Sequence, residues 1–150
     1  ALEYLQDNLR ILSGFYGILK PLDGIVPYRL EMQSKFINYK NKDLYEYWAD
    51  KIANSLFEET NLIINLASKE YSKCVKNSPG TKFITCVFGE INGDKVIEKG
   101  TLAKMARGEM VRYLAQNNVY DLEGLKRFDK LGYKYSQEKS NENTYVFIKY

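Results

Sequence analysis

The chain contains no histidine and only two cysteines, Cys74 and Cys86, among its 150 residues. Without histidine it offers no Ser-His-Asp or Cys-His catalytic arrangement, and no zinc or iron site with a histidine ligand. Two cysteines do not make a disulfide framework and favour a reducing compartment. A metal would need carboxylates or these two thiols, and no spaced cluster offers them. We therefore expect neither a metal nor another cofactor.

Long apolar runs are also missing. No run of about 18 apolar residues occurs, so we expect no membrane span, and no charged-then-apolar leader opens the chain, so we expect no secretory signal. Hydrophobic residues make up 45% and charged residues 27%, as is ordinary for a soluble globular protein. The length predicts one domain over residues 1–150 with a real core, and we take the protein as a monomer.

The net charge of +3 is too small to indicate a nucleic-acid partner by itself. Its distribution is more informative, because Lys99 to Lys134 holds eight basic and four acidic residues, a balance of +4 that leaves −1 for the rest of the chain. A local basic surplus is expected of a surface that contacts phosphates. A solvated helix surface would explain it almost as well.

Glycine and proline are few, at ten and three, but three glycines and two prolines lie between Leu12 and Met32. Gly14 follows an apolar helical stripe and suits the end of a helix from Leu2 to Ser13. A turn and a short strand from Tyr28 to Met32 should follow. Because apolar residues surround the polar groups of this stretch, we expect the loop to pack down and to serve binding.

This glycine-rich stretch is the first candidate site. The free N–H groups of a turn with two close glycines, Gly14 and Gly17, can cradle a phosphate. Such a turn is similar to the hairpin of a helix-hairpin-helix DNA-binding unit, although two residues separate the glycines here. Lys20 and Arg29 would add cationic contacts. The alternative is an ordinary tight turn between packed elements.

The stretch also contains two carboxylates, Asp23 and Glu31, close in sequence to Arg29. A carboxylate oriented by an arginine is a workable general base, so these are weak candidates for catalytic residues. The alternative, which we favour, is a structural salt bridge.

The helix expected from Thr101 to Asn117 is the second candidate site. At 100° per residue, an apolar arc of Leu102, Ala106, Met110, Tyr113 and Leu114 faces inward. The opposite arc carries Lys104, Arg107, Gly108 and Arg112. Gly108 costs helix stability, and on the basic face it would let a partner approach closely. The alternative is a plain solvated face.

A third candidate lies where the apolar run Leu62 to Asn65 leads into a helix expected from Lys69 to Val75. A strand, a small polar turn and a helix place N–H groups at the helix start, which would make an anion site of Asn65 and Ser68. The alternative is a helix capped by Ser68.

The remaining elements predict an α+β fold, with helices packed on a mixed or antiparallel sheet. Asn92-Gly93-Asp94 is a strong hairpin signal, and Asp43 and Asp121 are plausible helix caps. The other expected elements are a loop at Ser34 to Asn41 tethered by Phe36 and Ile37, a helix from Asp43 to Glu59, a turn at Asn77 to Gly80, strands at Thr81 to Ile91 and Lys95 to Glu98, a helix from Asp121 to Phe128, and antiparallel strands at Tyr133 to Gln137 and Thr144 to Lys149.

The chain resembles the YaaA family of peroxide stress proteins over essentially all 150 residues. The longest matching motif runs from Leu12 to Asp23 and continues from Pro27 to Met32. Further matches are Lys42 to Tyr45 with Trp48, Ile64 to Ser68 with Glu70 and Tyr71, Lys104 with Ala106 to Gly108, Gly132-Tyr133, and the closing strand up to Lys149.

The resemblance implies a cytoplasmic protein that binds DNA and limits peroxide damage by keeping free iron low. Family members carry a further N-terminal segment, beginning with a strand, that this chain lacks. We expect double-stranded DNA as the partner, bound in one basic cleft lined by the glycine-rich stretch and the basic helix. An enzyme acting on a nucleotide or damaged nucleic acid is the alternative, and the residues favour a binding protein over it.

Overall fold

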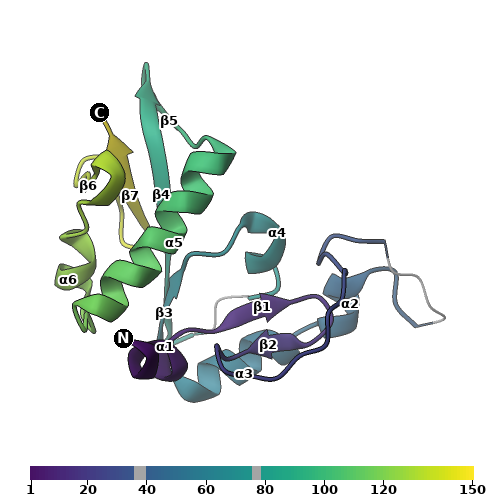
Figure 1. Cartoon of the computed structure of the whole chain (residues 1–150). Helices are drawn as coiled ribbons and strands as arrows, with labels where there is room; N and C mark the ends of the chain where they lie inside the picture. Colours follow the sequence, from purple (N-terminus) through teal and green to yellow (C-terminus); the bar gives the residue numbers. More distant parts are fainter. Residues whose placement is uncertain (36–39, 76–78) are drawn as a thin grey trace. The chain divides into compact units, whose positions relative to one another are not determined.

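The computed structural model describes residues 1–35, 40–75 and 79–150, and it confirms the α+β class. These residues gather into two compact units, one of residues 1–5, 64–66 and 83–150 and a second of residues 6–63 and 67–82. Figure 1 labels their elements. None of the helices within these ranges is long and apolar enough to cross a membrane.

A mixed sheet forms the centre of the first unit. It takes the order β3-β4-β7-β6, with β5 paired to β4. β4 and β7 run parallel, whereas the β4–β5 and β6–β7 pairs are antiparallel. The strands are β3 (Leu62–Asn65), β4 (Lys82–Asn92), β5 (Lys95–Ile97), β6 (Tyr133–Tyr135) and β7 (Thr144–Lys149).

The predicted hairpin after β4 is confirmed. Asn92 pairs with Lys95, so Gly93 and Asp94 form a two-residue loop. Gly93 has a φ of +64°, a conformation that glycine adopts without steric cost.

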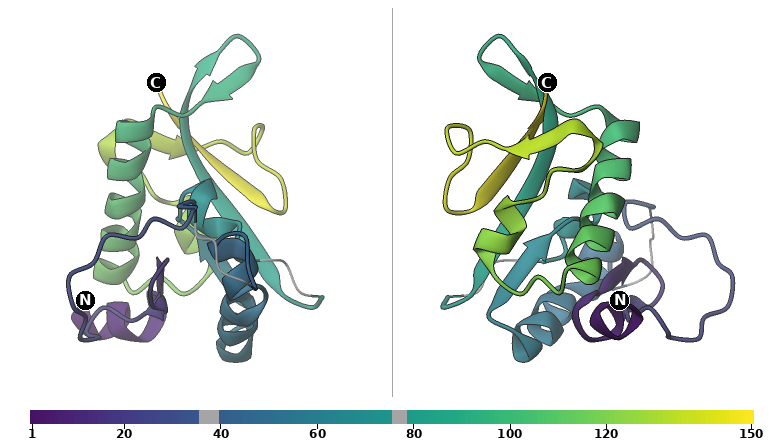
Figure 2. Two further views of the ribbon diagram at one scale, coloured as in Figure 1. Left: turned by 90° about the vertical axis from the view of Figure 1, so that its right-hand side faces the viewer. Right: turned by 60° about the vertical axis from the view of Figure 1, so that its left-hand side comes forward.

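Two helices cover one side of this sheet (Figure 2). They are α5 (Gly100–Gln116) and α6 (Leu122–Lys126), and α6 begins at the predicted cap, where the Asp121 carboxylate accepts the Gly124 N–H at 2.6 Å. Phe88 of β4 stacks on Phe147 of β7 at 5.2 Å between centroids, and Phe128 meets both edge-on. The core of this unit is therefore an aromatic layer between the sheet and its helices.

The described part of the second unit contains a two-stranded sheet and three complete helices. Its elements are β1 (Ile11–Ser13), β2 (Gly17–Leu19), α2 (Leu44–Trp48), α3 (Lys51–Glu59) and α4 (Lys69–Ser72). Met32, Leu44 and Ile52 are buried in its core. The predicted cap Asp43 is confirmed by its bond to the Glu46 N–H.

The long helix expected from Asp43 to Glu59 is instead divided. Ala49 ends α2 with a φ of +45°, and α3 starts after Asp50. Ala49 is exposed rather than inward-facing, as the break in the helix requires.

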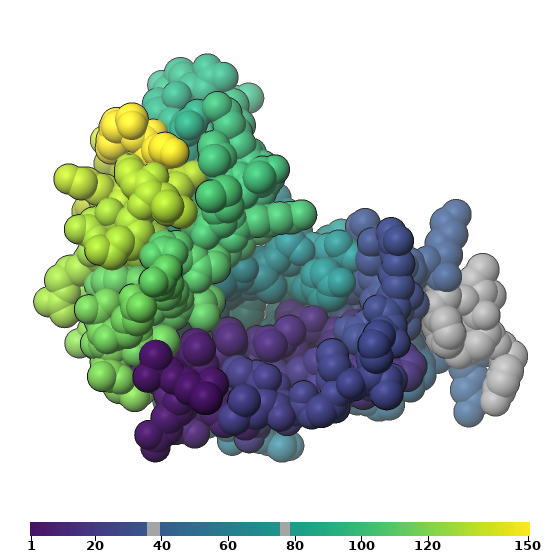
Figure 3. Space-filling view, in the orientation of Figure 1, coloured from purple at the N-terminus to yellow at the C-terminus, as the bar shows by residue number. Residues whose placement is uncertain are grey.

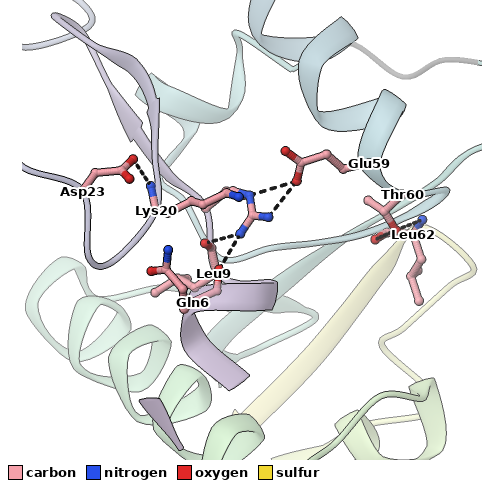
Figure 4. A network of polar contacts seen from close by, with 8 residues as sticks. Gln6, Leu9, Lys20, Asp23, Glu59, Thr60 and Leu62 are labelled. Atoms are coloured by element: carbon pink, nitrogen blue, oxygen red, sulfur yellow. Dashed lines mark hydrogen bonds and ion pairs between the residues drawn. The ribbon is translucent and has the colours of Figure 1, made fainter. Parts of the chain in front are cut away.

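The helix expected from Leu2 to Ser13 was also too long, because α1 (Leu2–Asn8) stops five residues earlier. Arg10 explains the stop. Its guanidinium binds the carbonyls of Gln6 and Leu9, two acceptors at the helix end, and it pairs with Glu59 at 2.8 Å (Figure 4). The chain then enters β1, so Gly14 lies in a strand hairpin and not at a helix end.

Three further expectations changed. No strand forms from Tyr28 to Met32, and residues 22–29 are exposed rather than buried, although hydrogen bonds from Leu22 and Val26 hold this part of the loop to the protein. α4 ends at Ser72, short of Val75. The tethers Phe36 and Ile37 and the first half of the turn at residues 77–80 lie outside the described residues.

Candidate nucleic-acid interface

Helix α5 presents an open basic face, which we define as Lys104, Gly108 and Arg112. These residues are spaced by four along the helix and all are exposed, whereas Ala103, Ala106 and Met110 are buried on the other side. Neither Lys104 nor Arg112 forms an ion pair with any other described residue. The outer side of α5 is seen in green in Figure 3. Both cations are therefore available to an external anion.

Arg107 differs from its neighbours on the helix. Its side chain is largely covered and pairs with Glu98, with 3.6 Å between Nη2 and Oε1. The same Glu98 oxygen accepts the N–H of Phe88 in β4 at 3.1 Å, and Arg107 Nε is buried without a hydrogen-bond partner among the described residues. The expectation that Arg107 belongs to the open basic face therefore needs correction, because this cation turns toward the sheet and ties α5 to it.

The space around Gly108 is empty. A Cβ added there would meet no atom within 4 Å, so no packing inside the described protein requires a glycine. Glycine in a helix interior costs about 0.5–1 kcal/mol relative to alanine. The glycine thus lowers the stability of α5 without an internal structural reason.

Gly14 and Gly17 are surrounded very differently. A Cβ on Gly14 would lie 2.7 Å from the Leu30 carbonyl oxygen, and one on Gly17 would lie 2.9 Å from the Trp48 ring. Gly17 also has a φ of +80°. Trp48 donates its indole N–H to the Gly14 carbonyl at 3.0 Å. Other parts of the chain therefore fill the space beside these glycines.

Three N–H groups in and beside the turn are also engaged. Ser13 Oγ accepts from the backbone of Phe15 at 3.3 Å and of Tyr16 at 3.0 Å, and Ile18 N–H binds the Tyr16 carbonyl. β1 and β2 rather than helices flank this turn. The likeness to a helix-hairpin-helix unit is thus limited to the glycine-containing turn, and the arrangement supports the tight-turn alternative.

Asp23 stabilises the turn that follows β2. Its carboxylate accepts the backbone N–H of Lys20 at 2.8 Å, and its own N–H returns to the Lys20 carbonyl at 3.1 Å (Figure 4). This is the behaviour of an aspartate in a tight turn. The carboxylate is exposed, so the turn gives it no dry environment for general-base chemistry.

Lys20, Arg29 and Glu31 are all exposed. Within the part of the chain that the structure describes, neither Lys20 nor Arg29 makes a side-chain ion pair, and the salt bridge expected between Arg29 and Asp23 or Glu31 does not form. The two cations remain available for phosphate contacts, and among the described residues no arginine is paired with either candidate base.

The contacts of Asn65 and the position of Ser68 test the predicted anion site. The Asn65 side chain is buried and donates to Thr85 Oγ1 at 3.2 Å, which joins β3 to β4. Ser68 occupies the cap position before the four-residue helix α4, but its hydroxyl makes no cap bond to any described residue. These contacts favour a structural explanation for Asn65 over an anion site.

Neither thiol is poised for redox chemistry. Burial raises the pKa of Cys74, and it raises the pKa of Cys86 to about 12. Since thiolates rather than thiols react with peroxides, we expect both residues to be oxidised slowly. No group of three or more cysteine, aspartate or glutamate side chains is placed to hold a metal within residues 1–35, 40–75 and 79–150.

An aromatic cluster of Phe15, Tyr16 and Tyr28 was not predicted as a site. The Phe15 ring lies 4.8 Å from that of Tyr16 and 5.4 Å from that of Tyr28. Although aromatic residues usually seek burial, Phe15 is 53% exposed and Tyr28 is 40% exposed. The available sequence signal was a pair of adjacent aromatic residues between two glycines of a turn.

Comparison with known proteins defines the class. The family model described as peroxide stress protein YaaA matches residues 1–139. The chain therefore belongs to the YaaA family of peroxide stress proteins, as the motifs in its sequence indicated.

Three bacterial relatives, each named UPF0246 protein, are similar over nearly the whole chain. The relative from Lachnoclostridium phytofermentans is 57% identical over 150 residues, which cover 99% of this chain and 59% of the relative. Those from Desulfitobacterium hafniense and Agathobacter rectalis are 52% and 53% identical, over 98% and 97% of this chain and 59% of each relative. The chain thus spans about three-fifths of the length of these relatives.

Proposed function

We propose that this protein binds double-stranded DNA through its cationic side chains and so limits peroxide and iron damage to DNA in the cytoplasm. The basic face of α5 supplies Lys104 and Arg112 from the first unit. Lys20 and Arg29 supply further phosphate contacts from the second.

The observation that supports this proposal is the basic face itself. Lys104 and Arg112 are exposed without an acidic partner among the described residues, and a step of eight residues along the helix places them about 12 Å apart along its axis. The open Gly108 between them would let a phosphate backbone approach the main chain. Arg107 is not required to contact DNA, because its pairing with Glu98 gives it a structural function.

The physical signature of such binding is its dependence on salt. Each phosphate neutralised by a lysine or arginine contributes about −0.9 to the slope of log affinity against log salt concentration. Binding of this kind is largely independent of sequence, since phosphates carry no base information.

The experiment measures the affinity for a fluorescent duplex of about 20 base pairs between about 50 and 200 mM salt. In the variant with Lys104→Gln and Arg112→Gln, the slope should become less steep by about 2. Lys134→Gln is the matched control, because it removes an exposed cation of the same unit outside α5. A slope unchanged in the double variant would contradict the proposal.

The same variants connect binding to protection. If DNA contact limits the damage, wild-type protein should reduce nicking of plasmid DNA by ferrous iron and hydrogen peroxide, and the double variant should protect less at equal concentration. Equal protection by both proteins would show that protection of DNA does not depend on the basic face.

A further inference from the structure

The aromatic cluster at the β1–β2 turn has the properties of a prepared binding surface. Its three rings contact one another, and the Phe15 and Tyr28 planes are inclined by only 31°. Both rings are exposed, although rings of this size would gain by burial. Exposed apolar groups gathered at one place commonly mark an interaction site.

Hydrogen bonds hold the two tyrosine rings of the cluster in position. The Tyr28 hydroxyl bonds to Ser13 Oγ, and the Tyr16 hydroxyl accepts the Val26 N–H at 3.0 Å. Ser13 is buried and its oxygen also accepts the N–H groups of Phe15 and Tyr16. Both hydroxyls are thus used inside the protein, and a ligand would meet two tyrosine rings that are already held in place.

Two cations and two acids lie close to the aromatic cluster in the sequence. Lys20 and Arg29 are exposed and have no ion-pair partner among residues 1–35, 40–75 and 79–150. Of the two acids, Asp23 already accepts the Lys20 N–H, and Glu31 is exposed. Exposed rings with unpaired cations close to them in the sequence are a combination found in proteins that bind unpaired nucleic acid, where bases stack on aromatic side chains and cations contact the phosphates.

We propose that the aromatic cluster is a stacking site for unpaired nucleobases, so that the protein holds single-stranded regions of DNA as well as duplex. This inference rests on the proposed function and deepens it. A protein segment is the competing occupant, because the neighbouring Leu22, Ile25 and Val26 are also exposed. The two tyrosine rings held by hydrogen bonds and the unpaired cations Lys20 and Arg29 favour nucleobases.

The test compares a fluorescent oligo(dT) with a duplex of the same length, both measured against the purified protein. Phe15→Leu removes the ring but keeps an apolar side chain. Its dissociation constant for oligo(dT) should rise about tenfold, and its dissociation constant for duplex should change by less than about twofold. Leu22→Ala, a matched loss of exposed apolar area without a ring, should alter neither constant.

A second measurement locates the contact directly. Irradiation of an oligonucleotide that carries 5-iodouracil should attach it to Phe15 or Tyr28, which mass spectrometry identifies. An unchanged oligo(dT) affinity in Phe15→Leu, or attachment only elsewhere, would overturn the stacking site. If Lys104→Gln with Arg112→Gln still weakens duplex binding, only the stacking site has failed; if wild-type protein binds neither DNA, the proposed function has failed too.

Discussion

Replacement of Gly108 by alanine tests both the energetics and the purpose of the basic face. The added methyl group meets nothing within 4 Å, so the gain in helix propensity is not offset by a clash. Alanine should raise the free energy of unfolding by about 0.5–1 kcal/mol. For a chain of this size, that corresponds to a rise of about 1–4 °C in the melting temperature.

The assay is thermal unfolding followed by circular dichroism, together with the dissociation constant for duplex DNA. Gly17→Ala is the contrasting variant, since its Cβ would lie 2.9 Å from the Trp48 ring and its φ of +80° disfavours alanine. We expect that variant to lose at least about 1–2 kcal/mol of stability from the backbone conformation alone. The two glycine-to-alanine substitutions should thus change the free energy of unfolding in opposite directions.

The DNA measurement separates stability from function. If a phosphate backbone approaches α5 at Gly108, alanine should weaken duplex binding in a protein that has become more stable. A less stable Gly108→Ala protein would refute the open face. A more stable variant with unchanged duplex affinity would refute the close approach and leave the glycine unexplained.

Two other predictions concern stability. Asp121→Ala removes the acceptor of the Gly124 N–H at the start of α6, and chemical unfolding should show a loss of about 1 kcal/mol, recovered in large part by Asp121→Asn. Burial raises the pKa of Cys86 from 9.0 to about 12. Below pH 9 the thiol is neutral in both the folded and the unfolded protein, so its contribution to the free energy of unfolding is complete. As the pH rises from 9 toward 12, the unfolded state loses the thiol proton more readily than the folded state, and this contribution declines. The difference in unfolding free energy between wild type and Cys86→Ala should therefore shrink across that range, and a difference that stays constant would contradict the burial.

The sequence predicted the first unit better than the second. α5 and the hairpin at Gly93 follow from periodicity and turn chemistry, which are local signals, and both formed within one residue of their expected bounds. The parallel pairing of β4 with β7 joins residues about sixty positions apart, and no local pattern encodes it. Only the class, a mixed or antiparallel sheet, was predictable.

In the second unit, long-range side-chain contacts override local preference. The apolar stripe of Leu5, Leu9 and Leu12 predicts a continuous helix, but Arg10 reaches Glu59 and ends it. The candidate site shows the same limit. Helical spacing placed Lys104 and Arg112 correctly on an exposed face, whereas the pairing of Arg107 with Glu98 depends on where β5 ends in space.

The position of β7 affects how the protein can be made. This strand lies between β4 and β6, and four consecutive residues, 145–148, are buried in it. Because residues 144–149 are synthesised after the other strands, the sheet has a vacant central place until they leave the ribosome. During translation β4 therefore exposes a long unpaired edge, and the nascent chain should depend on chaperones or on rapid synthesis to avoid aggregation at that stage.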